Sequence, residues 1–266
     1  FAPAPNHRGK WRVVETALKL TRRDAADRGK IFEVERAGLR WVLGPDCAVQ
    51  RRVLYHGVLD VHDTRALLGH VGHGAVFFDI GSYFGYYAML AAKRGAEVLA
   101  FEPSPGNFAL LRRHKELNAL DAVHVFPLAL SDRTGNAAFA AATADNRGRG
   151  HLIPGVSGGE TIETITLDDF AEQQRITRLD ALKLDVEGAE LKVLSGGAAT
   201  LRRFRPVMLV EINPPCLARF ETTERELVAA IHDFGFATFL VKHGALIEFS
   251  ARADASEYVN VLCLPP

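Results

Sequence analysis

The 266-residue sequence has few cysteines, no net charge and no long apolar run. Its three cysteines, Cys47, Cys216 and Cys263, are odd in number and far apart, which argues against a disulfide framework and against a zinc cluster. The 32 basic and 32 acidic side chains cancel, so bulk attraction to nucleic acid or to an anionic membrane is not expected. The longest apolar stretches, such as 122–130, fall short of the roughly 20 residues that span a membrane.

These absences leave a soluble globular protein as the expected class. Hydrophobic residues make up 48% and charged residues 24% of the chain, which is typical of such proteins. The first fifteen residues contain no apolar core of the signal-peptide type. We therefore expect a cytoplasmic protein with no nucleic-acid or membrane partner, and the sequence leaves open whether it forms a homo-oligomer.

From about residue 75 onward, short apolar runs alternate with helical patterns. Strand–helix–strand units of this kind build a mostly parallel, doubly wound α/β sheet with helices on both faces. The predicted strands are 75–80, 97–101, 123–126, 181–184 and 206–212. The predicted helices are 84–93, one that begins at Ser104 and Pro105, one that carries Leu191 and Leu201, and one capped by Thr223 with Glu226. Two last strands, 236–241 and 258–264, have no helix between them and predict an antiparallel C-terminal hairpin at one edge.

The first 70 residues differ from the rest and predict a small N-terminal α+β cap on the main domain, which we place at 71–266. A helix is expected around Trp11, Val14 and Leu18, and a hairpin from strands 31–35 and 39–43. Asp63 is expected to cap a further helix. Residues 140–160 are rich in Gly, Ala and Asn and are predicted to form a long loop that, with the cap, surrounds the substrate.

The sharpest motif follows the first predicted strand of the main domain. Asp79 is followed by a turn that contains Gly81 and Gly85, and Glu102 ends the second strand 21 residues after Gly81. Such a turn lets backbone N–H groups approach a ligand, and an acid at this position accepts hydrogen bonds from ribose hydroxyls. The turn reads G-x-x-x-G, whereas dinucleotide sites read G-x-G-x-x-G. Together with Asp79, which can hold an amino group, this favours S-adenosylmethionine over NAD.

Six motifs give the chain a family resemblance. They are DIGSYFGYY (79–87), AFEPSPGNFALLRRHKELN (100–118), ALSD (129–132), ITLDDF (165–170), LKLDVEGAE (182–190) and RPVMLVEIN (205–213). Over roughly residues 75–241 the sequence resembles the FkbM-type methyltransferases. The resemblance implies a class I, Rossmann-like methyltransferase fold, S-adenosylmethionine as the methyl donor, and methylation of a hydroxyl on a sugar or natural product.

The resemblance also implies roles for individual residues in cofactor binding. Asp79, Gly81 and Gly85 would line the methionine end, with Ser82 and Tyr83 in the same turn, and Glu102 would hold the ribose. Further residues would shape the adenosine pocket: Pro103, Ser104 and Asn107, with Leu128 and Ala129 near the adenine. The chain departs from the family at Tyr83, where Asn is usual; Asn tolerates left-handed backbone better than Tyr.

Candidate catalytic residues follow the fourth and fifth strands of the main domain: Asp185, Glu187, Glu211 and Asn213. Methyl transfer needs an acceptor oxygen in line with the sulfur–methyl bond and partly deprotonated. Either a carboxylate is the general base, or Asp185, Glu211 and Asn213 bind Mg²⁺, which lowers the pKa of the hydroxyl. Glu187 is equally suited to stabilising the next helix N-terminus, and Lys183 to an ion pair with Asp185.

These patterns predict an S-adenosylmethionine-dependent O-methyltransferase with a small hydroxylated acceptor. Two alternatives remain from the sequence: a non-catalytic binding protein with the methyltransferase fold, and an NAD-dependent oxidoreductase. The acceptor and the methylated atom are left open.

Overall fold

The computed structural model describes residues 27, 29–140, 150–154, 160–252 and 256–266. The predicted helix around Trp11, Val14 and Leu18 lies outside these residues. The described chain divides into two compact units, the first ending at Leu59 and the second beginning at Asp60.

The first unit holds the predicted hairpin and one helix. Strands β1 (Phe32–Arg36) and β2 (Leu39–Leu43) pair antiparallel. The turn between them consists of Ala37 and Gly38, both with positive φ, as a tight two-residue hairpin requires. The helix α3 (Ala48–His56) was not predicted, since its polar residues Gln50, Arg51 and Arg52 obscure the apolar pattern.

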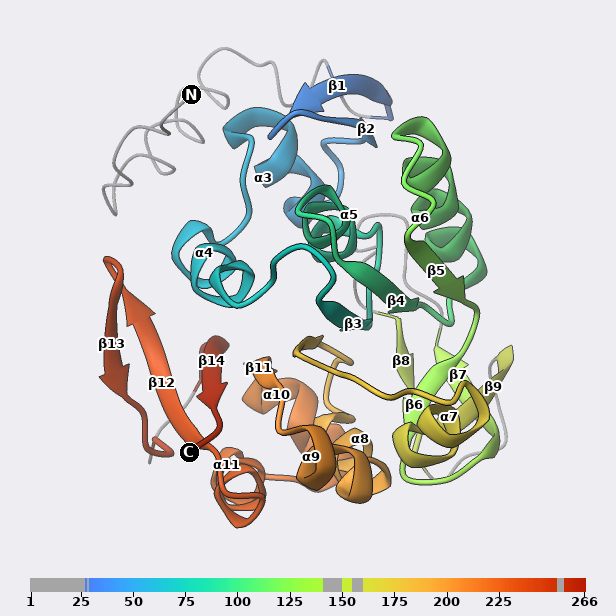
Figure 1. The fold of residues 1–266 in the computed structure, drawn as a ribbon. Helices are drawn as coiled ribbons and strands as arrows, with labels where there is room; N and C mark the ends of the chain where they lie inside the picture. Colours follow the sequence, from blue (N-terminus) through green and yellow to red (C-terminus); the bar gives the residue numbers. More distant parts are fainter. Residues whose placement is uncertain (1–26, 28, 141–149, 155–159, 253–255) are drawn as a thin grey trace. The chain divides into compact units, whose positions relative to one another are not determined.

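The second unit is built on an eight-stranded sheet with the order β13-β12-β14-β11-β10-β3-β4-β5 (Figure 1). Its parallel strands are β3 (Val76–Ile80), β4 (Glu97–Phe101), β5 (Val123–Phe126), β10 (Ala181–Leu184) and β11 (Val207–Ile212). Its antiparallel strands are β12 (Ala237–Lys242), β13 (Ala245–Glu248) and β14 (Val259–Leu264). The doubly wound, mostly parallel sheet and the antiparallel pairing of the two last predicted strands are confirmed. The edge strand β13 was not predicted.

Helices cover both faces of this sheet. Figure 1 shows α4 (Val61–Gly69) and α5 (Tyr86–Lys93) on one side, and α8 (Glu190–Gly196), α9 (Ala198–Phe204) and α11 (Glu224–Asp233) on the other. The remaining helices are α6 (Pro105–Leu117), α7 (Leu167–Gln173), α10 (Pro214–Leu217) and the 3₁₀ turn η1 (Ala218–Phe220). The capping box of Thr223 and Glu226 is present as predicted.

Two helix predictions were wrong in detail. The helix expected through Leu191 and Leu201 is interrupted at Gly197, which ends α8 and begins α9. A Cβ on Gly197 would lie 2.6 Å from Leu167 Cδ2, so a larger residue there would force Leu167 of α7 to shift. The helix α4 starts after Asp60 and not at Asp63, which lies inside its first turn.

A second, four-stranded sheet was not predicted. It consists of β6 (Ala129–Ser131), β7 (Gly135–Ala140), β8 (His151–Leu152) and β9 (Glu160–Thr166), in the order β6-β9-β7-β8. The loop predicted over 140–160 is interrupted by the strand β8 at 151–152, and its first and last residues belong to β7 and β9. Residues 141–149 and 155–159 lie outside the described residues. Side chains of this sheet pack with Ala189, which follows β10, so the sheet supports the chain after that strand.

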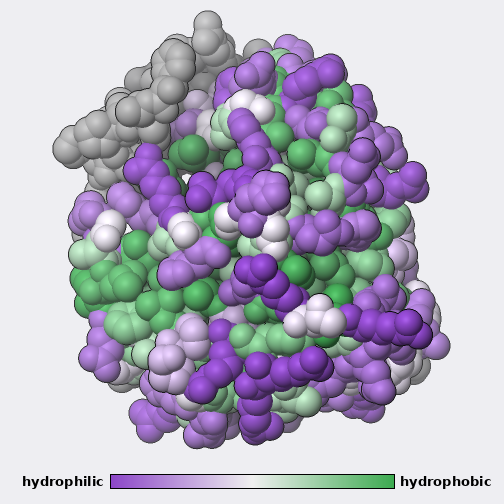
Figure 2. Space-filling view, viewed as in Figure 1, coloured by the Kyte–Doolittle hydropathy of each residue, from purple (hydrophilic) through white to green (hydrophobic). Residues whose placement is uncertain are grey.

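Aromatic side chains fill the core around β3 and β4. Phe101 and Phe170 lie edge to face with ring centroids 4.7 Å apart, and Phe78 contacts both. On the surface, Figure 2 shows apolar residues gathered where Figure 1 draws β12 and β13; Leu246 and Ile247 of β13 are exposed. None of the helices in the described residues combines the length and apolarity needed to cross a membrane.

Candidate active site

The turn between β3 and α5 contains two glycines at positions where a side chain would be strained. Gly81 has φ +80°, and a Cβ on it would lie 1.8 Å from the carbonyl oxygen of Asp185. Gly85 has φ +85°, and a Cβ would lie 2.3 Å from Leu111 Cδ1. The absence of a side chain therefore lets the turn lie directly against the carboxyl end of β10 at Gly81, and against Leu111 of α6 at Gly85.

Tyr83, between these glycines, adopts the left-handed conformation with φ +52°. This conformation costs a non-glycine residue about 1–2 kcal/mol. Its N–H donates to Glu102 Oε2 at 2.8 Å, and its ring packs edge to face on Phe84 with centroids 5.0 Å apart. The backbone thus follows the path that Asn would favour, although the side chain is Tyr.

Glu102 ends β4 with its carboxylate buried and well supplied with donors. Oε2 accepts from Tyr83 N, and Oε1 accepts from Ser104 N at 2.9 Å and Asn107 Nδ2 at 3.5 Å. Burial raises the pKa of Glu102 to about 7, against the effect of these donors. Pro103 connects Glu102 to Ser104, which is the predicted N-cap residue of α6.

Asp79, inside β3, is 2% exposed and holds the start of α5. Its Oδ2 accepts from Ala88 N at 2.9 Å, and Ser82 Oγ donates to the Asp79 carbonyl at 2.6 Å. Burial raises the pKa of Asp79 to about 7. Leu128 and Ala129 follow β5, the next strand beyond β4, and Ala129 begins β6. The residues predicted for the cofactor thus lie along the ends of three neighbouring strands.

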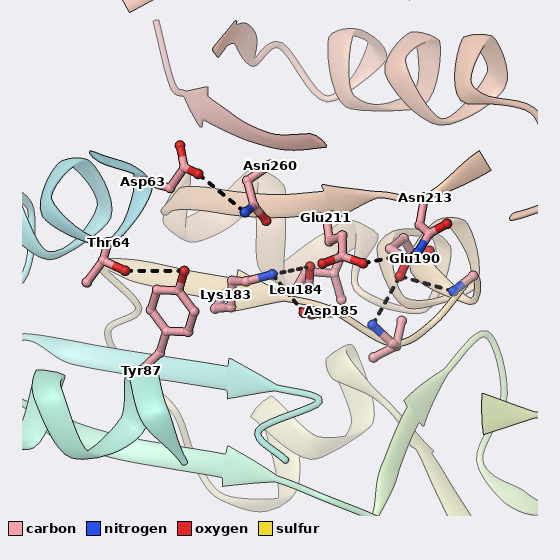
Figure 3. Close-up of polar contacts among 12 residues, drawn as sticks. Asp63, Thr64, Tyr87, Lys183, Leu184, Asp185, Glu190, Glu211, Asn213 and Asn260 are labelled. Atoms are coloured by element: carbon pink, nitrogen blue, oxygen red, sulfur yellow. Dashed lines mark hydrogen bonds and ion pairs between the residues drawn. The ribbon is translucent and has the colours of Figure 1, made fainter. Parts of the chain in front are cut away.

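The predicted catalytic residues lie at the neighbouring strand ends. Asp185 and Glu211 come one residue after the register pair Leu184–Val210 of β10 and β11, so they are neighbours along the sheet. Lys183 Nζ lies 3.3 Å from Asp185 Oδ2 (Figure 3). Burial alone would lower the pKa of Lys183, but Asp185 and Glu211 together raise it above its ordinary value. The predicted ion pair is present, and the ammonium stays protonated.

Glu211 has other carboxyls close to it. Burial raises its pKa well above the ordinary value, the charge of Asp185 raises it further, and Lys183 only partly opposes both. Asn213 Nδ2 donates to Glu211 Oε1 at 3.4 Å. Glu211 thus has Asn213 as a hydrogen-bond partner and Asp185 as a neighbouring charge.

Glu187 does not cap the next helix, contrary to the alternative considered from the sequence. It adopts φ +55° and accepts a hydrogen bond from Cys216 Sγ at 3.1 Å, whereas the N-cap residue of α8 is Ala189. Glu190, in the first turn of α8, instead accepts from Val186 N at 3.0 Å and Gly188 N at 3.2 Å. Glu190 thus fixes the loop that carries Glu187.

Sequence reasoning missed three polar residues of this region: Glu190, Asn260 and Asp63. Glu190 is 2% exposed, and burial raises its pKa to about 7. Asn260 of β14 pairs with Glu211 in register, and its Nδ2 donates to Asp63 Oδ2 at 3.3 Å. Burial raises the pKa of Asp63 to about 6. Glu190 is the last residue of the LKLDVEGAE motif, and Asn260 is a polar residue in an apolar strand. Both residues could therefore have been recognised as candidates from the sequence.

The donor set does not fit a metal ion well. Within the described part of the chain, no three His, Cys, Asp or Glu side chains are arranged to hold one. Asp185, the first expected Mg²⁺ ligand, already has the ammonium of Lys183 beside it.

Comparison with known proteins identifies the family. Residues 79–238 match the family model of the methyltransferase FkbM domain. The chain belongs to the FkbM methyltransferase family. The matched residues include Asp79, Glu102, Asp185 and Glu211, whereas Asp63 and Asn260 lie outside them.

Two named methyltransferases are similar in sequence to this chain. The chain is 32% identical over 149 residues to the hexuronic acid methyltransferase AglP of Haloferax volcanii, covering 56% of this chain and 60% of AglP. It is 29% identical over 148 residues to the 2-O-methyltransferase NoeI of Sinorhizobium fredii, covering 49% of this chain and 60% of NoeI. The chain thus matches about three-fifths of the length of these curated relatives.

A solved FkbM methyltransferase from Methylobacillus flagellatus is also similar. It shares 17% identity and a TM-score of 0.49 with this protein, over 81% of this chain and 52% of the other. The fold assigned to this chain rests on its own strand order.

Proposed function

We propose that this FkbM-family chain is an S-adenosylmethionine-dependent O-methyltransferase that methylates a hydroxyl of a sugar or a related small molecule. The observation that carries the proposal is that the predicted cofactor and acceptor residues lie side by side at the carboxyl ends of the central strands. Lys183, which pairs with Asp185, is also the register partner of Asp79, so the predicted cofactor and acceptor halves adjoin. The family match supports methyl transfer. The name of NoeI supports an oxygen as the methylated atom, and the name of AglP supports a sugar acceptor.

The residues present fit the proposed cofactor. Glu102 would accept the ribose hydroxyls, with Pro103, Ser104 and Asn107 around it, and the Gly81–Gly85 turn would face the methionine end with Asp79 behind it. Leu128 and Ala129 would border the adenine. When bound, S-adenosylmethionine supplies an electrophilic methyl group.

In the proposed reaction, Asp185 is the general base. Its carboxylate takes the proton of the acceptor hydroxyl as that oxygen forms a bond to the methyl carbon, while the sulfur–carbon bond breaks. S-adenosylhomocysteine and the methyl ether leave, and the proton passes from Asp185 to solvent. Lys183 holds Asp185 in place, and Glu187 and Glu211 hydrogen-bond the acceptor.

A divalent cation is not needed in this scheme. The positive charge beside Asp185 is that of Lys183, whose Nζ also lies over the ring of Tyr87, 5.8 Å from its centroid. Mg²⁺ at Asp185, Glu211 and Asn213 is the alternative, and turnover that requires Mg²⁺ would favour it.

Family membership argues against the NAD-dependent alternative. The proposal also includes a cytoplasmic location, where the free thiols of Cys47, Cys216 and Cys263 would persist, and no nucleic-acid partner. The assay below distinguishes the methyltransferase from the non-catalytic binding protein.

The test is transfer of a labelled methyl group from S-adenosylmethionine to a panel of methyl glycosides, in EDTA and in Mg²⁺. We expect product in both buffers. Asp185→Asn should lower kcat by about 100-fold or more with unchanged S-adenosylhomocysteine affinity, and Glu102→Ala should abolish that affinity. Full activity of Asp185→Asn would refute the assigned base, and cofactor binding without transfer to any glycoside would favour the non-catalytic alternative.

A further inference from the structure

One buried polar side chain close to the predicted cofactor site has no part in the proposed reaction. His114 of α6 is 0% exposed, and its Nδ1 lies 2.8 Å from the carbonyl oxygen of Phe84. A carbonyl oxygen only accepts hydrogen bonds, so Nδ1 carries the proton and donates it. Burial of an imidazole costs free energy unless it is hydrogen-bonded, and here that bond is made to the glycine turn between β3 and α5.

The buried face of α6 contacts the predicted cofactor site at three levels. It consists of Asn107, Leu111 and His114, spaced i, i+4 and i+7 along the helix. Asn107 Nδ2 donates to Glu102 Oε1 at 3.5 Å. Leu111 Cδ1 lies 2.3 Å from where a Cβ on Gly85 would be, and His114 holds the carbonyl that precedes this glycine. One helix face thus supports both the acid expected to bind the ribose and the turn expected at the methionine end.

The backbone N–H groups of this turn donate largely within the protein. Those of Gly81 and Ser82 both donate to Phe101 O, at 3.0 and 2.9 Å. That of Tyr83 donates to the carboxylate that ends β4, and that of Gly85 donates to Ser82 O at 2.7 Å. These four N–H groups are therefore engaged already, and what the turn offers a ligand at these positions is the path of its backbone.

That path is strained and depends on the contacts around it. Tyr83 has φ +52°, and a non-glycine residue keeps such a conformation only where the surrounding structure fixes it. The peptide unit that joins Phe84 to Gly85 is held at both ends: its oxygen accepts from His114, and its N–H donates to Ser82 O. Without the imidazole one of these two anchors is lost, and glycine tolerates many alternative values of φ.

We propose that His114 is a positioning residue for the cofactor, whose Nδ1–H fixes the carbonyl of Phe84 and thereby holds the glycine turn in the shape that admits S-adenosylmethionine. This inference rests on the proposed function, since it concerns the cofactor of the same site. The effect of His114 passes through the turn and not through the proposed base Asp185. Loss of the imidazole should therefore raise KM for S-adenosylmethionine and leave kcat at saturating cofactor nearly unchanged.

The experiment compares calorimetric affinities for S-adenosylhomocysteine among three variants of His114. His114→Asn places an amide N–H near the position of Nδ1, His114→Gln places one near that of Nε2, and His114→Leu has no donor. We expect the affinity to fall about tenfold or more in His114→Leu and His114→Gln, because the Phe84 carbonyl loses this donor. His114→Asn should stay within about threefold of the wild type.

A second measurement examines the turn without ligand. Amide hydrogen exchange at Gly85, whose N–H belongs to the anchored peptide unit, should be faster in His114→Leu than in the wild type or in His114→Asn. Val228→Ala is the matched control for lost packing. Val228 is 4% exposed and lies in α11, which packs against α8 and β12. It should lower the free energy of unfolding and leave both the affinity and the exchange at Gly85 unchanged.

Equal affinity of His114→Leu and the wild type would overturn the inference. A His114→Asn variant that binds as weakly as His114→Leu would do the same, because lost volume would then explain the effect. Should circular dichroism show that His114→Leu does not fold, the Asn and Gln variants decide, and equal affinities of these two would overturn the inference. Failure of the proposed function is distinguishable, because the wild type itself would not bind S-adenosylhomocysteine, while the exchange at Gly85 would still show whether His114 holds the turn.

Discussion

The proposed site has a cofactor half, at the ends of β3 and β4, and an acceptor half, at the ends of β10 and β11. The two halves differ in how their buried polar side chains obtain hydrogen bonds. In the cofactor half, Glu102 accepts from two backbone N–H groups and one amide, and Asp79 accepts from Ala88 N. In the acceptor half, Glu190 Oε2 and Asn260 Oδ1 have no donor within the described residues. The comparison teaches that backbone and amide donors satisfy the carboxylates of the first half, whereas the second half keeps buried acceptors without donors.

The largest effect should come from breaking the cofactor half at Gly81. In Gly81→Ala the new Cβ would lie 1.8 Å from a backbone oxygen at a left-handed φ, so the turn or β10 must shift. We expect a loss of about 4 kcal/mol in the free energy of unfolding and no S-adenosylhomocysteine binding, measured by denaturant titration and calorimetry.

Gly106→Ala is the matched control for this substitution. It lies in the first turn of α6, and nothing lies within 4 Å of its added Cβ. An equal loss in both variants would mean that the close approach at Gly81 does not matter.

Breaking the acceptor half at Lys183 should have the next largest effect. Lys183→Met leaves Asp185 and Glu211 without their buried cation, and loss of one partner of a buried ion pair costs about 3–5 kcal/mol. We expect a loss of about 3 kcal/mol in the free energy of unfolding, measured by denaturant titration, and at least partial recovery in Lys183→Arg. Unchanged stability of Lys183→Met would contradict the assigned role of the ammonium.

The pH dependence of stability should sharpen the comparison. Asp79, Glu102 and Glu190 have pKa values raised to about 7 in the folded protein. The folded state therefore binds more protons than the unfolded state between about pH 4 and 7, and the stability so contributed is lost as the pH rises through 7. We expect the free energy of unfolding of the ligand-free protein to fall between pH 5 and 8.

Glu190→Gln should reduce that fall by about 2 kcal/mol, because it removes one of these titrating groups. Asp121→Asn, which removes an exposed carboxylate before β5, should not change it. Stability that rises over this interval would show that the carboxyls are not held as the structure indicates.

The smallest effect concerns Tyr83, whose contribution to Glu102 is a backbone N–H. Tyr83→Asn keeps that N–H and eases the left-handed backbone, but loses the ring contact with Phe84. We expect stability within about 1 kcal/mol of wild type. Cofactor affinity, measured by calorimetry, should be nearly unchanged; a loss as large as that of Glu102→Ala would assign the cofactor contact to the ring itself.

Sequence reasoning succeeded where the structure is local and failed where it depends on register. The glycine turn and Glu102 lie within two consecutive strand–helix units, so their spacing predicts that they meet, and Tyr83 N in that turn donates to Glu102 Oε2. The contact of Asn260 with Asp63 joins residues 197 positions apart and exists because β14 inserts between β11 and β12. The pattern of each strand predicts its existence, but not its neighbour in the sheet.

The small sheet was missed for a related reason. The strand β9 (Glu160–Thr166) is rich in the β-branched residues Ile and Thr, which favour a strand. Its partner β6 has only three residues, and its other partner β7 contains Gly and three Ala, so neither gives a clear strand pattern. The pairing of β6 and β7 with β9, and the packing of this sheet on Ala189, decide the structure there.

The most direct test of the central claim is calorimetric titration with S-adenosylhomocysteine in EDTA, comparing the wild type with Glu102→Ala. We expect saturable one-to-one binding to the wild type, unchanged when Mg²⁺ replaces EDTA, and no measurable binding to the variant. Equal affinity of both proteins, or no binding to the wild type, would contradict the cofactor site placed at the ends of β3 and β4.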